Sequence, residues 1–278
     1  MLTTDRVLST VRRGRSFSAT LAGRARSARR PLQVVILAAG MGTRLGRPEP
    51  KPLTRLRDGR TILQRQVSAL RAVLGDDVPI TAVVGYRSEL IMSAAPDLLF
   101  AYNPDFAVTN TSKSLLRALR SSRPGGVLWL NGDVVFDPSV LELALPWLRA
   151  DHSTICVDTN TVADEEVKYT LDEGGYVRDL SKTVVGGLGE AVGINYVSGA
   201  DKAALIAHLE RCADGDYFER GIETAIAEHR LRFRPVDISQ FGAVEVDFEA
   251  DLQRANALLP GTPLLVGLDL EVAAAEAG

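Results

Sequence analysis

The sequence predicts an α/β protein in which a doubly wound, mainly parallel sheet is extended by a smaller accessory half. From Leu32 onward, short apolar runs alternate with segments whose apolar residues recur at helical spacing. The first apolar run, 34–39, leads straight into a glycine-rich loop, which is how the strands of such sheets end at a ligand crevice. In the second half the apolar runs are shorter and turn at Gly174-Gly175, which indicates a mixed or antiparallel addition.

The first half alternates strands and helices in the order that builds a parallel sheet. Strands are expected at VVILAA (34–39), ITAVVGY (80–86), LLFAYN (98–103) and VLWLNGDVVF (127–136), the last interrupted by Asn-Gly-Asp. Helices are expected at TILQRQVSALRAVL (61–74) and SKSLLRALRS (112–121). Ser112 is the expected N-cap of the second helix, because a serine hydroxyl can accept from the free N–H groups of the first turn.

The second half contains shorter elements. STICVD (153–158), VKYTLDE (167–173) and GYVRDLSK (175–182) are typical of strands, and the loop GGLGE (186–190) leads into the strand GINYV (193–197). Helices are expected at 201–212 and 216–229, followed by a strand within LRFRPVDI (231–238), a short extended VEVD (244–247) and a closing helix from Phe248 to about Leu259. We therefore expect one domain over 31–260, preceded by an extension, 1–30, and followed by a tail, 261–278.

Charge is distributed unevenly along the chain. Residues 1–30 contain eight arginines and one aspartate, a local charge of +7, so with an overall charge of −3 the remainder carries −10. An acidic main domain argues against nucleic-acid binding through a broad basic face. The Arg- and Ser-rich extension is typical of a transit peptide, a membrane-surface arm or a weakly ordered leader.

The composition favours a cytoplasmic protein. No apolar run approaches the roughly 20 residues that a transmembrane helix needs. The two cysteines, Cys156 and Cys212, are far apart and lack metal-ligand spacing, so we expect buried free thiols in a reducing compartment.

The glycine loop after the first strand departs from two well-known phosphate-binding patterns. The dinucleotide pattern G-x-G-x-x-G fits at Gly40 and Gly42, but its third position is Leu45 and Gly46 comes one residue late. A P-loop needs Lys-Ser or Lys-Thr directly after glycine, whereas Lys51 is followed by proline.

A longer pattern accounts for the loop. Leu-Ala-Ala-Gly-x-Gly-Thr-Arg-Leu (37–45) followed by Lys-Pro-Leu (51–53) resembles the signature of the nucleotidyltransferases that activate sugar phosphates and phospho-alcohols, the MobA-like NTP transferase fold. The resemblance implies a Rossmann-like doubly wound mixed sheet with a small accessory acceptor-binding half. It also implies a nucleoside triphosphate lying across the loop, against Leu37, Ala38, Ala39, Gly40, Gly42 and Thr43.

The loop's two cations fit that chemistry. A triphosphate carries about four negative charges, and its transfer reactions depend mainly on positioning and charge neutralisation. Arg44 can hold phosphate oxygens of the leaving pyrophosphate in a two-pronged contact, and Lys51 can act as a point charge near the α-phosphate. The alternative is that both are ordinary exposed loop residues.

Carboxylates for a metal ion are expected at two places. Asp133 follows a buried strand and so lies at the carboxyl edge of the sheet, where the family has its first Mg²⁺-binding aspartate. Glu245 and Asp247 are two apart on an extended segment, so both project to the same side. The resemblance favours Asp247 as a direct Mg²⁺ ligand and Glu245 as a second ligand or an orienting group. Alternatively, one of them caps the helix that begins near Phe248.

The resemblance favours CTP as the nucleotide. Where sugar-1-phosphate enzymes usually carry a Gly-Thr-Ala-type segment, this chain reads NPDFAVTNTSKSLLRAL, which is similar to the cytidylyltransferases for phosphocholine, inositol-1-phosphate and phosphonates. The Glu-x-Asp at 245–247 and GEAVGI at 189–194 point the same way. By this resemblance Asn110 and Ser114 lie near the base and ribose, and Gly85 and Tyr86 border the base.

The acceptor half offers Lys182, at the position of a phosphate-binding lysine in sugar-phosphate members, and Glu190, for an ammonium or a hydroxyl group. A trimethylammonium group normally sits among aromatic rings, and we expect only Tyr169, Tyr176 and Tyr196 in this half. Phosphonates, aminoethyl groups and polyols are therefore better candidates than phosphocholine. Two rival functions stay open, namely a sugar-1-phosphate nucleotidyltransferase using UTP, dTTP or GTP, and a catalytically silent nucleotide-binding homologue.

Overall fold

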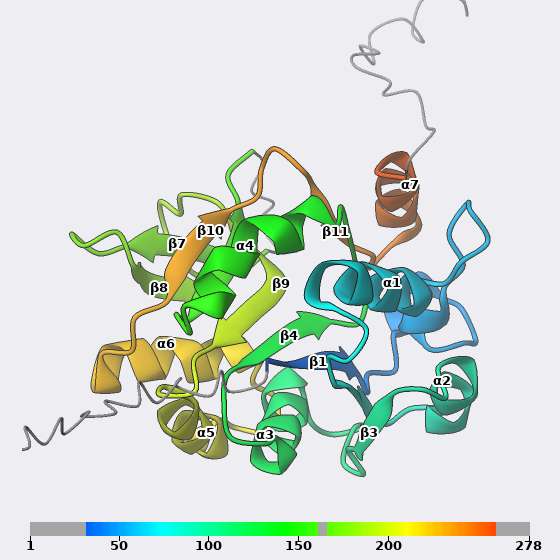
Figure 1. Ribbon diagram of the computed structural model, residues 1–278, viewed down its shortest axis with the longest axis horizontal. Helices are drawn as coiled ribbons and strands as arrows, with labels where there is room; N and C mark the ends of the chain where they lie inside the picture. The colour runs from blue at the N-terminus through cyan, green and yellow to red at the C-terminus, as the bar shows by residue number, and fades with distance from the viewer. Residues whose placement is uncertain (1–31, 161–165, 260–278) are drawn as a thin grey trace, which may run out of the picture.

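The computed structural model describes residues 32–160 and 166–259 (Figure 1). The extension expected at 1–30 and the tail expected at 261–278 lie outside the described residues. The predicted α/β class with a mixed, mainly parallel sheet is confirmed.

The central sheet carries the fold. Its strands lie in the order β10 (Arg234–Asp237), β6 (Thr154–Asp158), β9 (Glu190–Val197), β4 (Val127–Asn131), β1 (Gln33–Ala38), β2 (Ile80–Val84) and β3 (Leu99–Tyr102). Strand β9 runs antiparallel to both its neighbours, whereas the other pairs along this order are parallel. Strands β7 (Lys168–Leu171) and β8 (Val177–Ser181) add an antiparallel extension next to β9, as the second-half pattern predicted.

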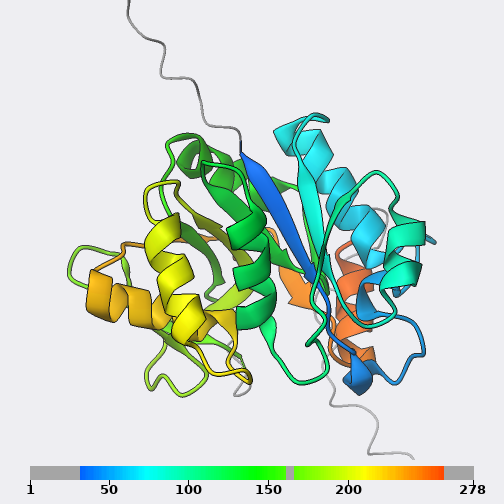
Figure 2. The same ribbon diagram turned by 90° about the horizontal axis from the view of Figure 1, so that it is seen from below.

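Helices cover both faces of the sheet, because alternate side chains of each strand point to opposite sides. On one face Val34 and Ile36 of β1 pack into a core with α1 (Ile62–Leu74) and α4 (Ser139–Arg149). On the other face Val35 and Leu37 pack with α3 (Thr111–Ser121), α5 (Lys202–Arg211) and α6 (Phe218–His229). These three helices lie beneath the sheet in Figure 1, and Figure 2, seen from below, shows them side by side in front of it.

A smaller third layer lies beside α1. Strands β5 (Val134–Phe136) and β11 (Ala243–Glu245) form a separate two-stranded antiparallel sheet. Helix α7 (Glu249–Ala257) packs against them and against the start of α1 through a third apolar cluster (Figure 1). This layer brings the segment that follows β11 back to the turn after β4, where the N–H of Val246 donates to the carbonyl of Asp133.

Several sequence-based expectations need correction. Two helices were not predicted, the short α2 (Ser88–Ala94) and α4, which contains Pro146 in its last turn. Asn110, rather than Ser112, caps α3, because the helix begins at Thr111 and the Asn110 side chain accepts from its backbone N–H at 2.8 Å. Strand β9 begins at residue 190, inside the segment expected to be a loop, and the last helix spans Glu249–Ala257 rather than reaching Leu259.

Two further expectations concern the cysteines and the membrane. Cys156 and Cys212 are free and buried, as predicted. Among residues 32–160 and 166–259, no helix is both long and apolar enough to span a bilayer.

The core predicts a clear stability test. Ile36 is fully buried in the central strand, so Ile36→Ala removes methyl groups and leaves a cavity, and we expect a loss of about 2–5 kcal/mol in the free energy of unfolding. Denaturant unfolding measures it. Val108→Ala, at a side chain that is 73% exposed, is the control and should change stability by less than about 0.5 kcal/mol. Equal losses in the two variants would contradict the assigned core.

Candidate active site

A cavity of about 280 Å³ opens at the carboxyl ends of β1 and β4. The parallel register pairs Leu37 with Asn131, so the glycine loop after β1 lies beside the Asn-Gly-Asp turn after β4. The predicted residues that line the cavity are Leu37, Ala38, Gly40, Gly42, Thr43, Arg44, Lys51, Asp133, Lys182, Glu245 and Asp247. Segments from both halves of the chain therefore meet at one site.

The Lys51 ammonium group is the centre of the site's charged network. It donates to Oδ2 of Asp133 at 2.8 Å and also to Oδ1 of Asp247. Burial alone would lower the pKa of Lys51, but the charges and hydrogen bonds of the two aspartates raise this pKa to about 12. One cation thus joins two carboxylates that are 114 residues apart in the sequence.

The backbone brings Asp133 and Asp247 together. Strand β11 pairs with β5 so that Glu245 lies opposite Val134, and the N–H of Val246 donates to the carbonyl of Asp133 at 3.0 Å. From the other side, the buried amide of Gln66 on α1 donates to the carbonyls of Asn131 and Val134, each at 2.8 Å. The turn that carries Asp133 is therefore fixed by α1 on one side and by β11 and Val246 on the other.

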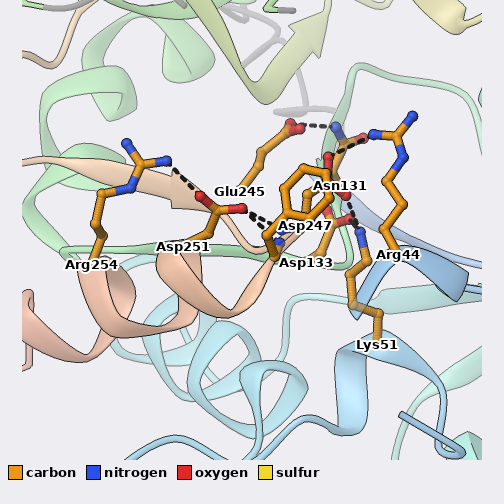
Figure 3. Close-up of polar contacts among 9 residues, drawn as sticks. Arg44, Lys51, Asn131, Asp133, Glu245, Asp247, Asp251 and Arg254 are labelled. Atoms are coloured by element: carbon orange, nitrogen blue, oxygen red, sulfur yellow. Dashed lines mark hydrogen bonds and ion pairs between the residues drawn. The ribbon is translucent and has the colours of Figure 1, made fainter. Parts of the chain in front are cut away.

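Asp247 points into the site and does not cap the following helix. Its Oδ2 accepts from Arg44 at 3.0 Å (Figure 3). The capping contacts are made by Asp251, whose Oδ2 accepts from the backbone N–H groups of Asp247 at 3.0 Å and Phe248 at 2.7 Å. Although burial opposes ionisation of Asp247, the hydrogen bond and charge of Lys51, followed by Arg44, hold its pKa below the ordinary value.

Glu245 is a third carboxylate that lines the cavity beside Asp133 and Asp247. Its Oε1 accepts from Nδ2 of Asn131 at 2.7 Å (Figure 3). Burial, and then the charge of Asp133, raises the pKa of Glu245 well above its usual range. A glycine at 193 makes room for this pair, because a Cβ there would lie 2.6 Å from Asn131 Nδ2 and 2.6 Å from Glu245 Oε1.

The glycine loop closes tightly over Lys51. Gly42 has φ of +59°, in the left-handed region that side chains other than glycine disfavour. A Cβ at this position would lie 3.1 Å from the Cβ of Lys51. The second glycine of the loop is therefore required both by the turn and by the close approach of the lysine.

The cavity lining also includes residues that the sequence analysis did not identify, most of them from the accessory half. The additional lining residues that carry polar or aromatic side chains are Thr111, Asn131, Glu166, Tyr217, Phe218 and Glu219. Tyr217 corrects the expectation that Tyr169, Tyr176 and Tyr196 supply the aromatic rings here, since none of those three is among the residues lining the cavity. An acidic residue between the apolar positions of the amphipathic segment 216–229 was the available signal for Glu219.

Some predicted residues lie beside the cavity rather than in its lining. Ala39 is buried behind the loop. Gly85 comes directly after β2 and lies so close to Ala39 that a Cβ at position 85 would be 2.8 Å from the Ala39 carbonyl oxygen. The Tyr86 ring packs against Phe106 with 6.3 Å between centroids. These positions support the loop from the neighbouring strand.

The remaining predicted residues are engaged by protein groups. Asn110 caps α3 and donates to the carbonyl of Gly215 at 3.3 Å. Ser114 is buried and accepts from Nδ2 of Asn103 at 3.2 Å. Glu190 opens β9 and lines a separate small cavity that shares Glu245 with the main one.

Comparisons with known proteins identify relatives of this chain. Residues 34–230 match the MobA-like NTP transferase domain. The chain is 30% identical over 254 residues to CMP-5′-(3-aminopropyl)phosphonate synthase of Streptomyces rubellomurinus, an alignment that covers 81% of this chain. The chain spans 38% of the length of that relative.

Solved structures share the fold at low sequence identity. The inositol-1-phosphate CTP transferase from T. maritima superposes with a TM-score of 0.67 at 16% identity, covering 83% of this chain and 97% of that one. The CTP:phosphocholine cytidylyltransferase from Streptococcus pneumoniae gives 0.66 at 16% identity, with 82% and 99% coverage. A putative glucose-1-phosphate thymidylyltransferase from Bacillus anthracis gives 0.65 at 15% identity, with 82% and 94% coverage.

The family resemblance inferred from the glycine loop is confirmed. The family match spans more than half of the chain and includes the loop, Lys51, Asp133 and the accessory half as far as residue 230. This chain belongs to the MobA-like NTP transferase domain family.

Proposed function

We propose that this protein is a Mg²⁺-dependent cytidylyltransferase, which transfers CMP from CTP to a phosphate or phosphonate oxygen and releases pyrophosphate. One observation carries the proposal. Lys51 and the two aspartates, Asp133 and Asp247, meet in a cavity that the glycine loop also lines. Cations for phosphate and carboxylates for a metal ion are thus combined at the carboxyl edge of the sheet.

The loop side suits a triphosphate. Arg44 and Lys51 both line the cavity, and both contact Asp247, so they are oriented toward its interior. A triphosphate bound across the loop would compete with the aspartates for these cations, because it carries about four negative charges whereas each aspartate carries one. Arg44 would then hold oxygens of the leaving pyrophosphate, and Lys51 would stabilise charge that develops at the α-phosphate.

The carboxylate side fits Mg²⁺. Asp133 and Asp247 already share one cation, the Lys51 ammonium group, so their side chains are close enough to bind another. The buried Oδ1 of Asn131 finds no partner within the described part of the chain, and Asn131 is among the residues lining the same cavity. Asp133 and Asp247 would hold the ion, with Glu245 orienting Asn131 behind them. Bound Mg²⁺ supplies positive charge to phosphate oxygens.

The proposed reaction is a direct displacement. An acceptor oxygen forms a bond to the α-phosphorus of CTP while the bond from that phosphorus to the β-phosphate oxygen breaks. CMP becomes linked to the acceptor, and the bond's electrons leave with pyrophosphate. The residues of the cavity bind and orient the two anions, and no covalent enzyme intermediate is required.

CTP is favoured by the relatives. The Streptomyces relative is named as a CMP-phosphonate synthase, and two of the structural neighbours are named as CTP-dependent enzymes. The same names, together with Lys182 in the cavity wall, support a phosphonate or phospho-alcohol acceptor. The roles of Gly85, Tyr86, Asn110 and Ser114 near the nucleoside stay predictions.

The first prediction concerns substrate choice. With Mg²⁺ present, pyrophosphate release should be at least tenfold faster with CTP than with UTP, dTTP, GTP or ATP. The acceptor panel comprises 3-aminopropylphosphonate, hydroxyethylphosphonate, phosphocholine, inositol-1-phosphate and hexose-1-phosphates. Turnover only with UTP, dTTP or GTP and a hexose-1-phosphate would contradict both the nucleotide and the acceptor class. Nucleotide binding without release from any pair would instead indicate a catalytically silent homologue.

The second prediction concerns the metal carboxylates. Asp133→Asn and Asp247→Asn keep the side-chain size but remove a charge, so each should lower kcat by at least about a hundredfold. Where residual turnover is measurable, the Mg²⁺ concentration for the half-maximal rate should rise. Asp97→Asn, at an exposed residue remote from the cavity, is the matched control and should retain wild-type rates. Wild-type Mg²⁺ dependence in both site variants would argue against these ligands.

A further inference from the structure

Glu219 is a buried acid in the acceptor wall of the cavity. It is the second residue of α6, only 9% exposed, and among the residues lining the cavity. Its Oε2 is buried and finds no hydrogen-bond partner among the described residues. Acids in the first turn of a helix are common because the helix dipole favours them, but an unpartnered buried oxygen is not explained by that preference.

Hydrogen bonds and ring packing fix the start of α6, and with it the backbone that carries Glu219. The backbone N–H of Phe218 donates to Oγ1 of Thr111 at 3.1 Å, and the N–H of Asn110 donates to the carbonyl of Asp214 at 2.7 Å. The Phe218 ring packs edge-on against the buried Trp129, with 5.6 Å between centroids. The helix start that carries Glu219 is thus attached to the start of α3.

Burial without a partner is costly for a carboxylate. Burial raises the pKa of Glu219 to about 7, although its own backbone N–H and then the charge of Lys182 act in the opposite direction. A ligand that brings N–H donors and a positive charge to Oε2 would remove this cost. The Glu219 carboxylate is therefore suited to bind a cationic group of a ligand.

Lys182 supplies the opposite charge in the same wall. Its Nζ lies 5.0 Å from the centroid of the Tyr217 ring, and both residues line the cavity. Glu166 adds a second carboxylate to this region. Among the residues that the structure describes, this wall therefore combines the Lys182 cation with the carboxylates of Glu166 and Glu219, an arrangement that suits a small ligand carrying both signs of charge.

Building on the proposed function, we infer that the acceptor is a zwitterion, with a phosphate or phosphonate at one end and a primary ammonium group that is bound by Glu219 at the other. Lys182 attracts the anionic end. A primary ammonium fits better than a trimethylammonium because the unpartnered Oε2 needs N–H donors, which a quaternary nitrogen lacks. The aromatic lining is also small, since Tyr217 and Phe218 are the aromatic residues that border the described cavity.

The test compares three acceptors of matched length, namely 3-aminopropylphosphonate, its trimethylammonium derivative and butylphosphonate, which keeps the phosphonate but has no ammonium group. The full chain is assayed with CTP and Mg²⁺. The wild-type protein should prefer the primary amine by at least tenfold in kcat/KM. Glu219→Gln should raise KM for this amine at least about tenfold, the scale of one hydrogen bond to a charged group, with kcat and the KM for CTP within about threefold. Its kcat/KM for butylphosphonate should stay near the wild-type value.

Glu228→Gln is the matched control, because Glu228 lies on the same helix but is exposed and paired with Arg211. It should keep every kinetic constant. If Glu219→Gln lowers turnover of all three acceptors equally, Glu219 only supports the fold and the inference fails. Turnover with CTP but no preference for the amine would overturn the inference while leaving the proposed function intact.

A binding measurement keeps the two proposals separable when no turnover is found with any nucleotide, a result that contradicts the proposed function itself. Calorimetric titration of 3-aminopropylphosphonate into the full chain should show binding that weakens at least tenfold in Glu219→Gln and stays unchanged in Glu228→Gln. Equal affinity of the wild-type protein and Glu219→Gln, or binding to neither, would overturn the assignment of the ammonium site.

Discussion

The Lys51 ammonium group, shared by Asp133 and Asp247, is the contact on which the site depends. Two carboxylates brought this close would repel one another without a cation between them. The contact also joins three distant segments, the glycine loop, the turn after β4 and the extended segment before α7. The pairing of β5 with β11 makes this contact possible, because it brings Asp247 back to the edge of the main sheet.

The cavity combines two walls of different construction. The phosphate wall is made by loops at the carboxyl ends of parallel strands, where backbone and cations converge. The acceptor wall depends on β9, which runs antiparallel and carries the chain back past β4 into the helices α5 and α6. Because the two walls come from separate segments, residues of the acceptor wall can change in such a fold without changing the residues of the phosphate wall. We regard Glu219 and Lys182 as the residues through which this chain selects its acceptor.

The sequence predicted what is encoded locally. Asp133 could be placed because it follows a continuous apolar strand, and the loop could be interpreted because its glycines and cations are adjacent in the chain. The pattern of 216–229 indicated an amphipathic helix that contains Tyr217 and Glu219, but it could not place them at the cavity, since they reach it only through packing of α6 against α3. The cap of α3 was assigned to Ser112 instead of Asn110 because hydroxyl and amide caps satisfy the same rule and differ here by two residues in where the helix starts.

The most direct test of the central claim is a crystal structure of the full chain with CTP and Mn²⁺ in place of Mg²⁺, using the anomalous signal of manganese to locate the ion. We expect an anomalous peak bound by carboxylate oxygens of both Asp133 and Asp247, with the triphosphate against the glycine loop. Lys51 and Arg44 should have exchanged aspartate contacts for phosphate oxygens. Manganese bound elsewhere, or a triphosphate that does not contact the loop while Lys51 still joins the two aspartates, would contradict the account.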